Sequence, residues 1–584
     1  MNYQSILKRQ TSIILISVIV MVLIIIGVSY SLFMQVDESN DVQVVESGTL
    51  VLSSNKGNTI TTNNVPLSDI EGLGSEGYTF SVKNNGTLGY LYNLYINNKA
   101  SSNPLEYEYI KISFDDGPVT KLSDLEVDSE KGLILLANNY IAPANEEGDV
   151  VTHNIKVWIE ETAPTSIIGK NILLQIDMYG EAGETFYKDS SGASEPELYS
   201  GLIPIRYDDN NQMIVTELDE KWYDYDAHEW ANAILIDQSN ADIKNKYLNA
   251  DGTYKSGTIV EETDILQMYV WIPRYKYQLF NAEGADTEAQ MINIEFESNT
   301  TSKSNGTQNG EWLTHPAFTF GTTELNGIWV GKFESSNTTS DLKIVPSVQS
   351  LRSQTVGSMF NASRAIEANS KYGLTLSEVD THMMKNMEWG AVAYLTSSKY
   401  GRYESTGSCI LSGCEVWINN NSNYTTGCAG SSVSESKTSS CNQWNTTYGV
   451  NASTTGNIYG IYDMSGGAFE YVMGNMSDSS GAFNPSYFGL SQPDSKYYDS
   501  YTYGTSLDDY SRGHLGDATK EVIANSGSYL AWNNDYADFV SSSYPWFYRG
   551  SYYYDGSGAG VFYFGRGDGD AHSNLSWRVV LSSE

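Results

Sequence analysis

The sequence predicts a multi-domain protein with an N-terminal transmembrane helix, an all-β sandwich and a larger C-terminal domain. The chain has 584 residues, which is too long for one hydrophobic core. Residues Ile13 to Val28 are almost continuously apolar, and short strand-like segments follow as far as Glu184. The composition then turns to Ser, Gly, Glu and Pro from Thr185 to Glu197, which is typical of a linker.

The balance of charges excludes one class of partner. The chain carries 71 acidic and 34 basic residues, for a formal net charge of -37. Such a surface repels phosphate backbones, so we expect no nucleic acid partner. Tyrosine is abundant, with 43 residues beside many Asn, Ser and Gly, a mixture that protein-binding surfaces also use.

Residues 1–35 are interpreted as a membrane signal anchor. Lys8 and Arg9 precede the apolar run, and with Ser29 to Met34 the run reaches about 20 residues, enough to cross a bilayer core. The positive flank predicts a single-pass protein of the cell membrane with its body outside. The alternative is a cleaved signal peptide and a secreted body, with Ser29 and Ser31 near the cut.

Residues 36–184 are predicted to form a β-sandwich stalk. Segments such as Tyr78–Lys83 and His153–Glu160 alternate apolar and polar side chains, and pairs such as Asn85-Gly86 mark turns. The stretch Tyr30–Ser54 also resembles the start of camelysin-type and biofilm-matrix proteins. Residues 185–265 are predicted to hold the linker and a small β-hairpin module.

The four cysteines are predicted to form disulfides. Cys409, Cys414, Cys428 and Cys441 lie together in one Ser/Asn/Gly-rich stretch, and an even, clustered set outside the cytoplasm usually pairs. Three pairings are open. A zinc site is the alternative, but the spacing lacks CxxC pairs and no histidine is nearby.

Residues 266–584 contain blocks in the order used by the formylglycine-generating-enzyme (sulfatase-modifying-factor) family, and the chain resembles that family over this range. The most specific blocks are Asn457–Val472 (NIYGIYDMSGGAFEYV), Tyr548–Ser551 and Trp577–Val580. Met383–Leu395 is similar to the family's Glu-Trp helix, with Glu388-Trp389 matching. The resemblance implies an α+β, C-type-lectin-like fold.

The resemblance also implies a structural calcium ion. In the family this ion is held by one side chain, two backbone carbonyls and a glutamate, which correspond here to Asp463, Gly466, Ala468 and Glu470. Oxygen ligands of this type suit a hard cation. The alternative is a capped turn in which Glu470 pairs with a neighbouring arginine or amide.

No catalytic residue is predicted. The family's oxidases hold copper through two cysteines, and Tyr554 and Ala559 stand where those would sit. The six histidines are scattered and form no HxxxHxE cluster, so we expect no redox cofactor.

The tail from Tyr552 to Ser576 is predicted to be a binding surface. Apolar segments around Val561 and Val579 frame positions that hold Tyr, Asp, Ser and His, and the tail contains no Lys, Glu, Gln, Met or Trp. This pattern resembles the variable region of proteins diversified by diversity-generating retroelements. The resemblance implies as ligand-binding residues Tyr552, Tyr553, Tyr554, Asp555, Ser557, Tyr563, Asp568, Asp570, His572 and Ser573.

Together these observations predict a non-catalytic, surface-displayed bacterial binding protein, receptor- or adhesin-like, for a protein or glycan ligand outside the cell. One alternative is a secreted oxidoreductase-type enzyme of the same superfamily. Another is a structural matrix or display component. Gln492-Pro493-Asp494 and Trp532–Asp535 also resemble sugar-binding tripeptides of C-type lectins.

Overall fold

The computed structural model describes two compact units, Met1–Thr185 and Phe186–Glu584, which we call the N-terminal and C-terminal units. The described residues are 35–36, 52–54, 66–75, 77–84, 90–98, 103–115, 117–125, 127–128, 133–141, 150–167, 170–181 and, apart from 209, 219, 251 and 302, residues 187–583.

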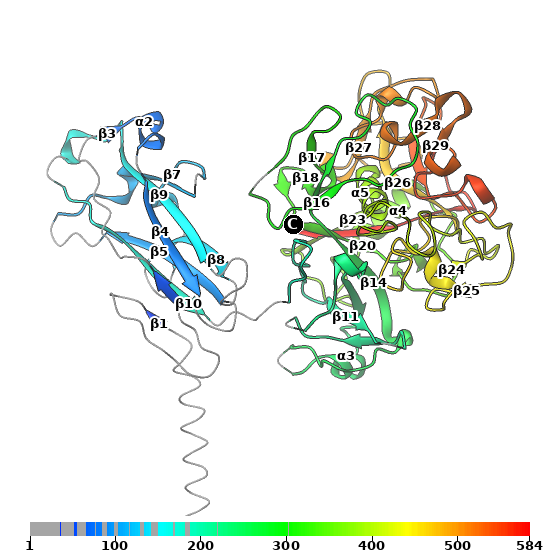
Figure 1. Ribbon diagram of the computed structural model, residues 1–584, viewed down its shortest axis with the longest axis horizontal. Coiled ribbons are helices and arrows are strands. Elements are labelled where there is room, and N and C mark those ends of the chain that lie inside the picture. The colour runs from blue at the N-terminus through cyan, green and yellow to red at the C-terminus, as the bar shows by residue number, and fades with distance from the viewer. Residues whose placement is uncertain are drawn as a thin grey trace, which may run out of the picture. The chain divides into compact units, whose positions relative to one another are not determined.

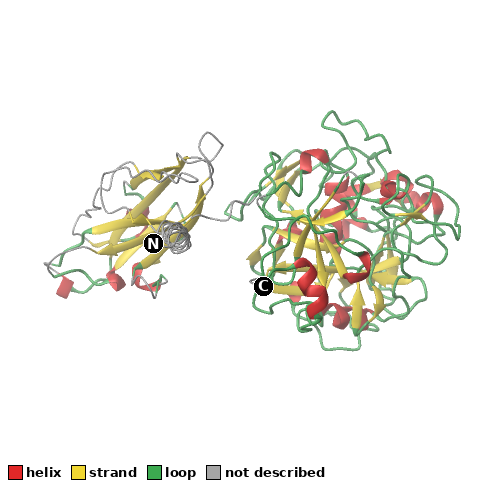
Figure 2. Cartoon of the chain, turned by 90° about the horizontal axis from the view of Figure 1, so that it is seen from below, coloured by secondary structure: helices red, strands yellow, loops and turns green. Residues whose placement is uncertain are grey.

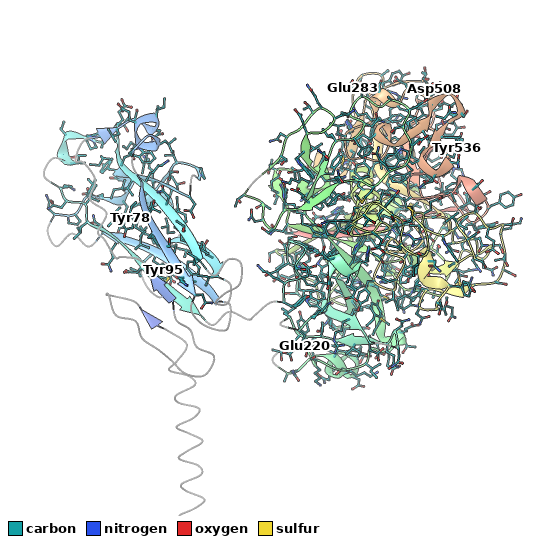
Figure 3. All side chains as sticks on the ribbon, in the orientation of Figure 1. Tyr78, Tyr95, Glu220, Glu283, Asp508 and Tyr536 are labelled. Carbon is teal, nitrogen blue, oxygen red and sulfur yellow. A yellow bond between two sulfur atoms is a disulfide. The ribbon has the colours of Figure 1, made fainter. Side chains whose placement is uncertain are left out.

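The N-terminal unit consists of two β-sheets with a common core. The first sheet has the order β1 (Gln35–Val36), β10 (Leu174–Glu181), β5 (Tyr90–Asn98) and β8 (Ile134–Ile141). The second has the order β2 (Leu52–Ser54), β4 (Tyr78–Asn84), β9 (Val150–Glu160), β6 (Ile110–Phe114) and β7 (Thr120–Lys121), with β3 (Pro66–Leu67) beside β9 and α2 (Asp69–Leu73) after it. Side chains of both sheets share two apolar clusters, to which Tyr78 contributes (Figure 3).

The predicted membrane helix is not supported. The longest α-helix in the described part of the chain is α5 (Asn386–Thr396), with 11 residues, whereas a spanning helix needs about 20. No helix among the described residues is long and apolar enough to cross a bilayer. The apolar run Ile13–Val28, on which the prediction rested, lies outside the described residues. The predicted fold class and the single-pass membrane location are corrected on this point, and the described chain is mostly β-sheet.

The C-terminal unit is built around a seven-stranded antiparallel sheet. Its order is β12 (Met213–Val215), β11 (Ile203–Tyr207), β13 (Asn232–Ile236), β14 (Ile265–Pro273), β20 (Gly327–Gly331), β33 (Val579–Ser583) and β23 (Val379–Met383) (Figure 1). Residues 185–265, expected to form a linker and a small hairpin module, thus supply β11, β12 and β13. The last strand, β33, lies between β20 and β23, so the end of the chain is part of the core.

A second sheet contains strands of the C-terminal tail. It contains β27 (Asp499–Tyr501), β26 (Phe469–Met476), β30 (Trp546–Arg549) and β31 (Phe564–Gly567), with β32 (Leu575–Trp577) parallel to β26. Smaller sheets and hairpins are formed by β15 (Tyr275–Gln278), β16 (Ile294–Phe296) and β17 (Trp312–Thr314); β18 (Thr319–Phe320) and β19 (Thr323–Glu324); β21 (Ser336–Thr338) and β22 (Asp341–Lys343); β24 (Cys428–Ala429) and β25 (Asn442–Gln443); and β28 (Ile523–Asn525) and β29 (Leu530–Ala531).

Helices are few, and long loops surround the strands of this unit (Figure 2). The α-helices described in it are α3 (Ala241–Tyr247), α4 (Val356–Arg364) and α5. All residues of α5 are buried, which explains why its sequence shows little amphipathic pattern.

The predicted disulfides are confirmed, and the pairing is Cys409–Cys414 and Cys428–Cys441. The second bridge joins β24 to the residue that precedes β25, next to the register pair Cys428 and Gln443. Two disulfides are consistent with an extracellular protein.

Glu521 is a buried carboxyl group without a cationic partner in the described part of the chain. Its Oε2 accepts hydrogen bonds from the Tyr277 hydroxyl (2.9 Å), the Tyr394 hydroxyl (3.0 Å) and the Gly516 amide (2.6 Å). Burial raises the pKa of Glu521 to about 7.

This shift predicts a loss of stability as the pH rises. A carboxyl group whose pKa is higher in the folded than in the unfolded state stabilises the fold below its unfolded pKa, and the stabilisation is lost as the pH rises through the folded value. Between pH 4.5 and pH 8, the wild type should lose about 3 kcal/mol of unfolding free energy relative to Glu521→Gln. Urea unfolding followed by tryptophan fluorescence measures this loss of unfolding free energy. The signal reports mainly on the C-terminal unit, because 11 of the 12 tryptophans lie in it and only Trp158 lies before it. Equal pH slopes for the two proteins would contradict the assignment.

Candidate functional site

The tail between β30 and β33 consists of buried frame positions and exposed positions. The frame is fixed in the core: Phe562 is 1% exposed, and Phe564 and Trp577 are 0% exposed. The indole of Trp389 in α5 donates a hydrogen bond to the Val561 carbonyl (2.8 Å), which ties the frame to the helix. The exposed positions are therefore held on a rigid support.

The first exposed segment is a turn of three tyrosines. The ring of Tyr552 lies 5.2 Å from that of Tyr553 and 6.1 Å from that of Tyr554, measured between centroids. Tyr554 is 57% exposed. The Ser551 hydroxyl donates to the Asp555 carboxylate (2.7 Å) and closes the turn, and Ser557 follows at the surface.

The second exposed segment lies further along the tail. His572 and Ser573 are exposed, and Asp568 and Asp570 are partly exposed. The His572 imidazole contacts the Asp568 carboxylate at 3.1 Å. The His572 carbonyl accepts a hydrogen bond from the Ser353 amide (3.0 Å), so this segment is fixed against the loop that precedes α4.

Two residues that sequence reasoning missed, Tyr424 and Arg352, connect the two segments. The Tyr424 ring packs edge-on against Tyr553, with the centroids 4.8 Å apart. The Arg352 guanidinium lies over the Tyr424 ring, 3.8 Å from its centroid. It also donates a hydrogen bond to the Ser573 carbonyl in the second exposed segment. No local sequence signal marks either residue, because both come from loops distant in the chain.

We call this surface the tail face. It consists of Tyr424 and Arg352 together with the exposed or partly exposed predicted residues Tyr552, Tyr553, Tyr554, Asp555, Ser557, Asp568, Asp570, His572 and Ser573. Its side chains offer aromatic rings, carboxylates, hydroxyls, an imidazole and one guanidinium, which is a set suited to recognition.

Tyr563 is the exception among the predicted binding residues. It is 4% exposed and lies beneath the surface, because its ring packs against Phe469 (5.6 Å), Tyr536 (5.9 Å, labelled in Figure 3) and Tyr548 (6.2 Å). Tyr563 therefore supports the tail face from below and does not form part of it.

The turn that precedes β26 is hydrogen-bonded to the start of the tail through backbone groups. The Gly466 amide donates to the Gly550 carbonyl (2.8 Å), and the Gly467 carbonyl accepts from the Tyr553 amide (2.9 Å). Both glycines have positive φ, and a Cβ atom at Gly467 would lie 2.5 Å from the Glu334 carboxylate. Glycine is thus required at this position.

The carboxylates predicted to bind calcium have other partners. Asp463 accepts hydrogen bonds from the Asn419 side chain (2.8 Å) and the Gly427 amide (3.0 Å). Both oxygens of Glu470 bind the Arg578 guanidinium, at 2.5 and 3.1 Å. This is the arrangement of the alternative prediction, in which Glu470 pairs with an arginine.

A third buried carboxyl group, Glu334, was not predicted. It accepts hydrogen bonds from the Ala468 amide (2.7 Å) and the Ser350 hydroxyl. Burial, with the nearby charges of Asp463 and Glu470, raises the pKa of Glu334 well above its usual range. Burial also raises the pKa of Glu470 to about 7, although Arg578 opposes this. The charge of Arg578 lowers the pKa of two of these three buried acidic groups, Asp463 and Glu470, against the effect of burial.

These residues do not fit a calcium ion as they are arranged. Calcium takes about six to eight converging oxygen ligands. In the described part of the chain no group of three or more His, Cys, Asp or Glu side chains is placed to hold a metal ion. Both Glu470 oxygens bind the Arg578 guanidinium and are not free for a cation. At Ala468 it is the amide, not the predicted carbonyl, that points at the nearest carboxylate, Glu334.

The remaining motifs are also accounted for. Tyr554, which the sequence resemblance placed at a copper-binding position, is exposed, and Ala559, placed at the other, is buried. The four cysteines are all in disulfides. Asp494 caps a turn by accepting from the Lys496 amide (3.0 Å). Asp535 is buried and accepts from the Phe562 amide (2.9 Å), so it supports the tail frame.

Comparison with known proteins adds no identification, since no protein-family model and no curated protein matches the chain.

The buried ion pair generates a stability prediction. Arg578→Met leaves the Glu470 carboxyl group and the Gly331 and Tyr462 carbonyls without their donor, and breaking a buried pair in this way costs about 3–5 kcal/mol. Removing both partners in Arg578→Met/Glu470→Leu should recover much of this loss. Urea unfolding of the full chain, followed by tryptophan fluorescence, measures the unfolding free energy of the single and the double variant. A single variant within about 1 kcal/mol of wild type would show that the pair is not needed.

Proposed function

We propose that this chain is a non-catalytic extracellular recognition protein, receptor- or adhesin-like, whose tail face binds a protein or glycan ligand. The observation that supports the proposal is the contrast between buried and exposed side chains within the tail, residues 552–577. Phe562, Phe564 and Trp577 are fully buried, while Tyr554, Ser557 and His572 are exposed. Exposed aromatic clusters on a rigid support are typical of binding surfaces.

The physical character of the tail face supports this function. Tyrosine provides a large contact area with few rotatable bonds, so little conformational entropy is lost on binding. The neighbouring Asp, Ser and His side chains supply hydrogen bonds that set specificity. The two disulfides support an extracellular setting.

We further propose that the exposed tail positions vary among copies of this protein, as in proteins diversified by retroelements. The support is that Tyr553, Tyr554 and Ser557 are exposed or partly exposed and lie outside the buried frame of Phe562, Phe564 and Trp577. A near-copy of the coding segment for Tyr548–Leu581 beside a reverse-transcriptase gene, differing only at adenines, would support this. Its absence would leave a fixed-specificity surface.

The two alternative functions have less support. An oxidase that uses a thiolate pair would need free cysteines, and all four are in disulfides. No observation on the N-terminal unit favours a polymerising matrix component.

Replacing Tyr552, Tyr553 and Tyr554 with alanine tests the proposal. If at least one of the three tyrosines is a binding hot spot worth about 2 kcal/mol, the triple variant should weaken capture by about 30-fold or more. Ligands for the assay come from a glycan array and a random peptide display library screened against the full chain. The melting temperature should fall only modestly, because only Tyr552 of the three packs against a core ring, that of Phe469 (4.8 Å between centroids).

The matched control is Tyr448, Tyr487 and Tyr503 replaced with alanine, since these tyrosines are 59%, 51% and 46% exposed and lie outside the tail. The control should retain capture. If both triple variants capture the ligand as well as wild type does, the tail face is not the binding surface.

A further inference from the structure

A polar pocket lies next to the tail face. Its volume is about 720 Å³, and it is lined by the β21–β22 hairpin, the loop 348–353 and Ser573 of the tail. Arg352 belongs both to this pocket and to the tail face, so the two are continuous. A ligand bound on the tyrosine turn could therefore extend into the pocket past Arg352.

The charge of the pocket is opposite to that of the chain. Two lining side chains, Lys343 and Arg352, are positive, and none is acidic, although the chain has a formal net charge of -37. Among the described residues, no carboxylate lies within ion-pair distance of either cation. The pocket therefore offers a local site for an anion on an otherwise repelling surface.

The partners of Arg352 leave part of its guanidinium free. Its Nε donates to the Ser350 carbonyl (3.4 Å), its Nη1 donates to the Ser573 carbonyl, and its face covers the Tyr424 ring. Nη2 has no partner among the described residues. These contacts fix the orientation of the guanidinium while one edge remains available, which is the geometry that carboxylate recognition uses.

Lys343 contributes the second charge. The nearby Asp341 carboxylate is held mainly by the Lys371 ammonium, whose hydrogen bond lowers the pKa of Asp341, and Lys343 adds a smaller electrostatic contribution. The charge of Lys343 thus remains available to a ligand in the pocket.

The rest of the lining is uncharged and hydrogen-bonding. Ser353, Ser573, Gln349 and Asn337 are exposed at the pocket. The Tyr424 ring contacts the lining residue Arg352, and the Tyr553 ring packs against Tyr424. Hydroxyl and amide groups suit a ligand with many hydroxyls, and aromatic faces suit the C–H face of a sugar ring. A carboxylated sugar presents all three features at once.

We propose that this pocket binds an acidic saccharide, with its carboxylate on Arg352 and Lys343 and the adjoining sugar on the tyrosines of the tail face. The inference rests on the proposed function, because it names the ligand class of the same surface.

The test compares saccharides that differ in one carboxylate. The full chain is assayed by biolayer interferometry against immobilised 3′-sialyllactose and lactose, and against tetragalacturonate and its methyl ester, at low and high NaCl. We expect each acidic probe to bind at least about 10-fold more tightly than its neutral partner, and the preference to shrink at high salt. Poly-glutamate is included as an acidic non-saccharide.

Arg352→Gln should weaken binding of the acidic probes by about 10-fold or more and leave the neutral probes unchanged, since a hydrogen bond to a charged group is lost. Lys343→Gln should also weaken binding of the acidic probes, but by less. Because Lys343 does not contact Tyr424, this variant leaves the Arg352–Tyr424 contact in place. Arg206→Gln, which removes an arginine elsewhere in the unit, is the matched control and should bind as wild type does. Melting temperatures check that each variant folds.

The pocket and the tail face can fail separately. Three results would overturn the acidic-saccharide assignment. The acidic and neutral probes could bind equally, or both Arg352→Gln and Lys343→Gln could retain binding of the acidic probes. Poly-glutamate could also bind as tightly as the acidic saccharides do. Capture that depends on Tyr552–Tyr554 then still supports the tail face. Acidic binding that is lost in Arg352→Gln but retained in the tyrosine triple variant supports the pocket and overturns the tail face as the main recognition surface.

Discussion

The buried ion pair between Arg578 and Glu470 connects the two main sheets of the C-terminal unit. Arg578 precedes β33 in the large sheet, and Glu470 lies at the start of β26 in the second sheet. The same guanidinium donates to the Gly331 carbonyl of β20 (2.7 Å) and the Tyr462 carbonyl (2.9 Å). One buried side chain thus joins both sheets and the turn that carries the tail.

The position of β33 explains why the tail can be both exposed and rigid. The end of the chain lies between β20 and β23, and β32 pairs with β26, so the tail is anchored in both sheets after its exposed segments. Before them, β30 pairs with β26 and β31. Because both ends are fixed in the core, we expect the exposed loop positions between them to contribute little to stability, which suits the proposed recognition role.

Sequence reasoning identified the parts of the structure that local pattern determines. The clustered cysteines predicted disulfides, and the apolar frame around Phe562 and Val579 separated buried from exposed tail positions. It misplaced Tyr563, because alternation along the tail is interrupted where the ring packs under the turn. It could not find Arg352, Tyr424 or Glu334, since these act through contacts between distant loops. Whether Asp463 and Glu470 face a cation or an arginine also depends on such contacts.

The measurement that tests this account most directly is a complete substitution scan of residues 552–577 for folding, read by protease resistance of the displayed chain. The account predicts that Tyr553, Tyr554, Ser557 and His572 accept nearly every residue except proline without loss of resistance. It predicts that Phe562, Phe564 and Trp577 accept only similar apolar residues. If the exposed tyrosines prove as intolerant as the frame, they are structural, and the tail face does not exist as a separate recognition surface.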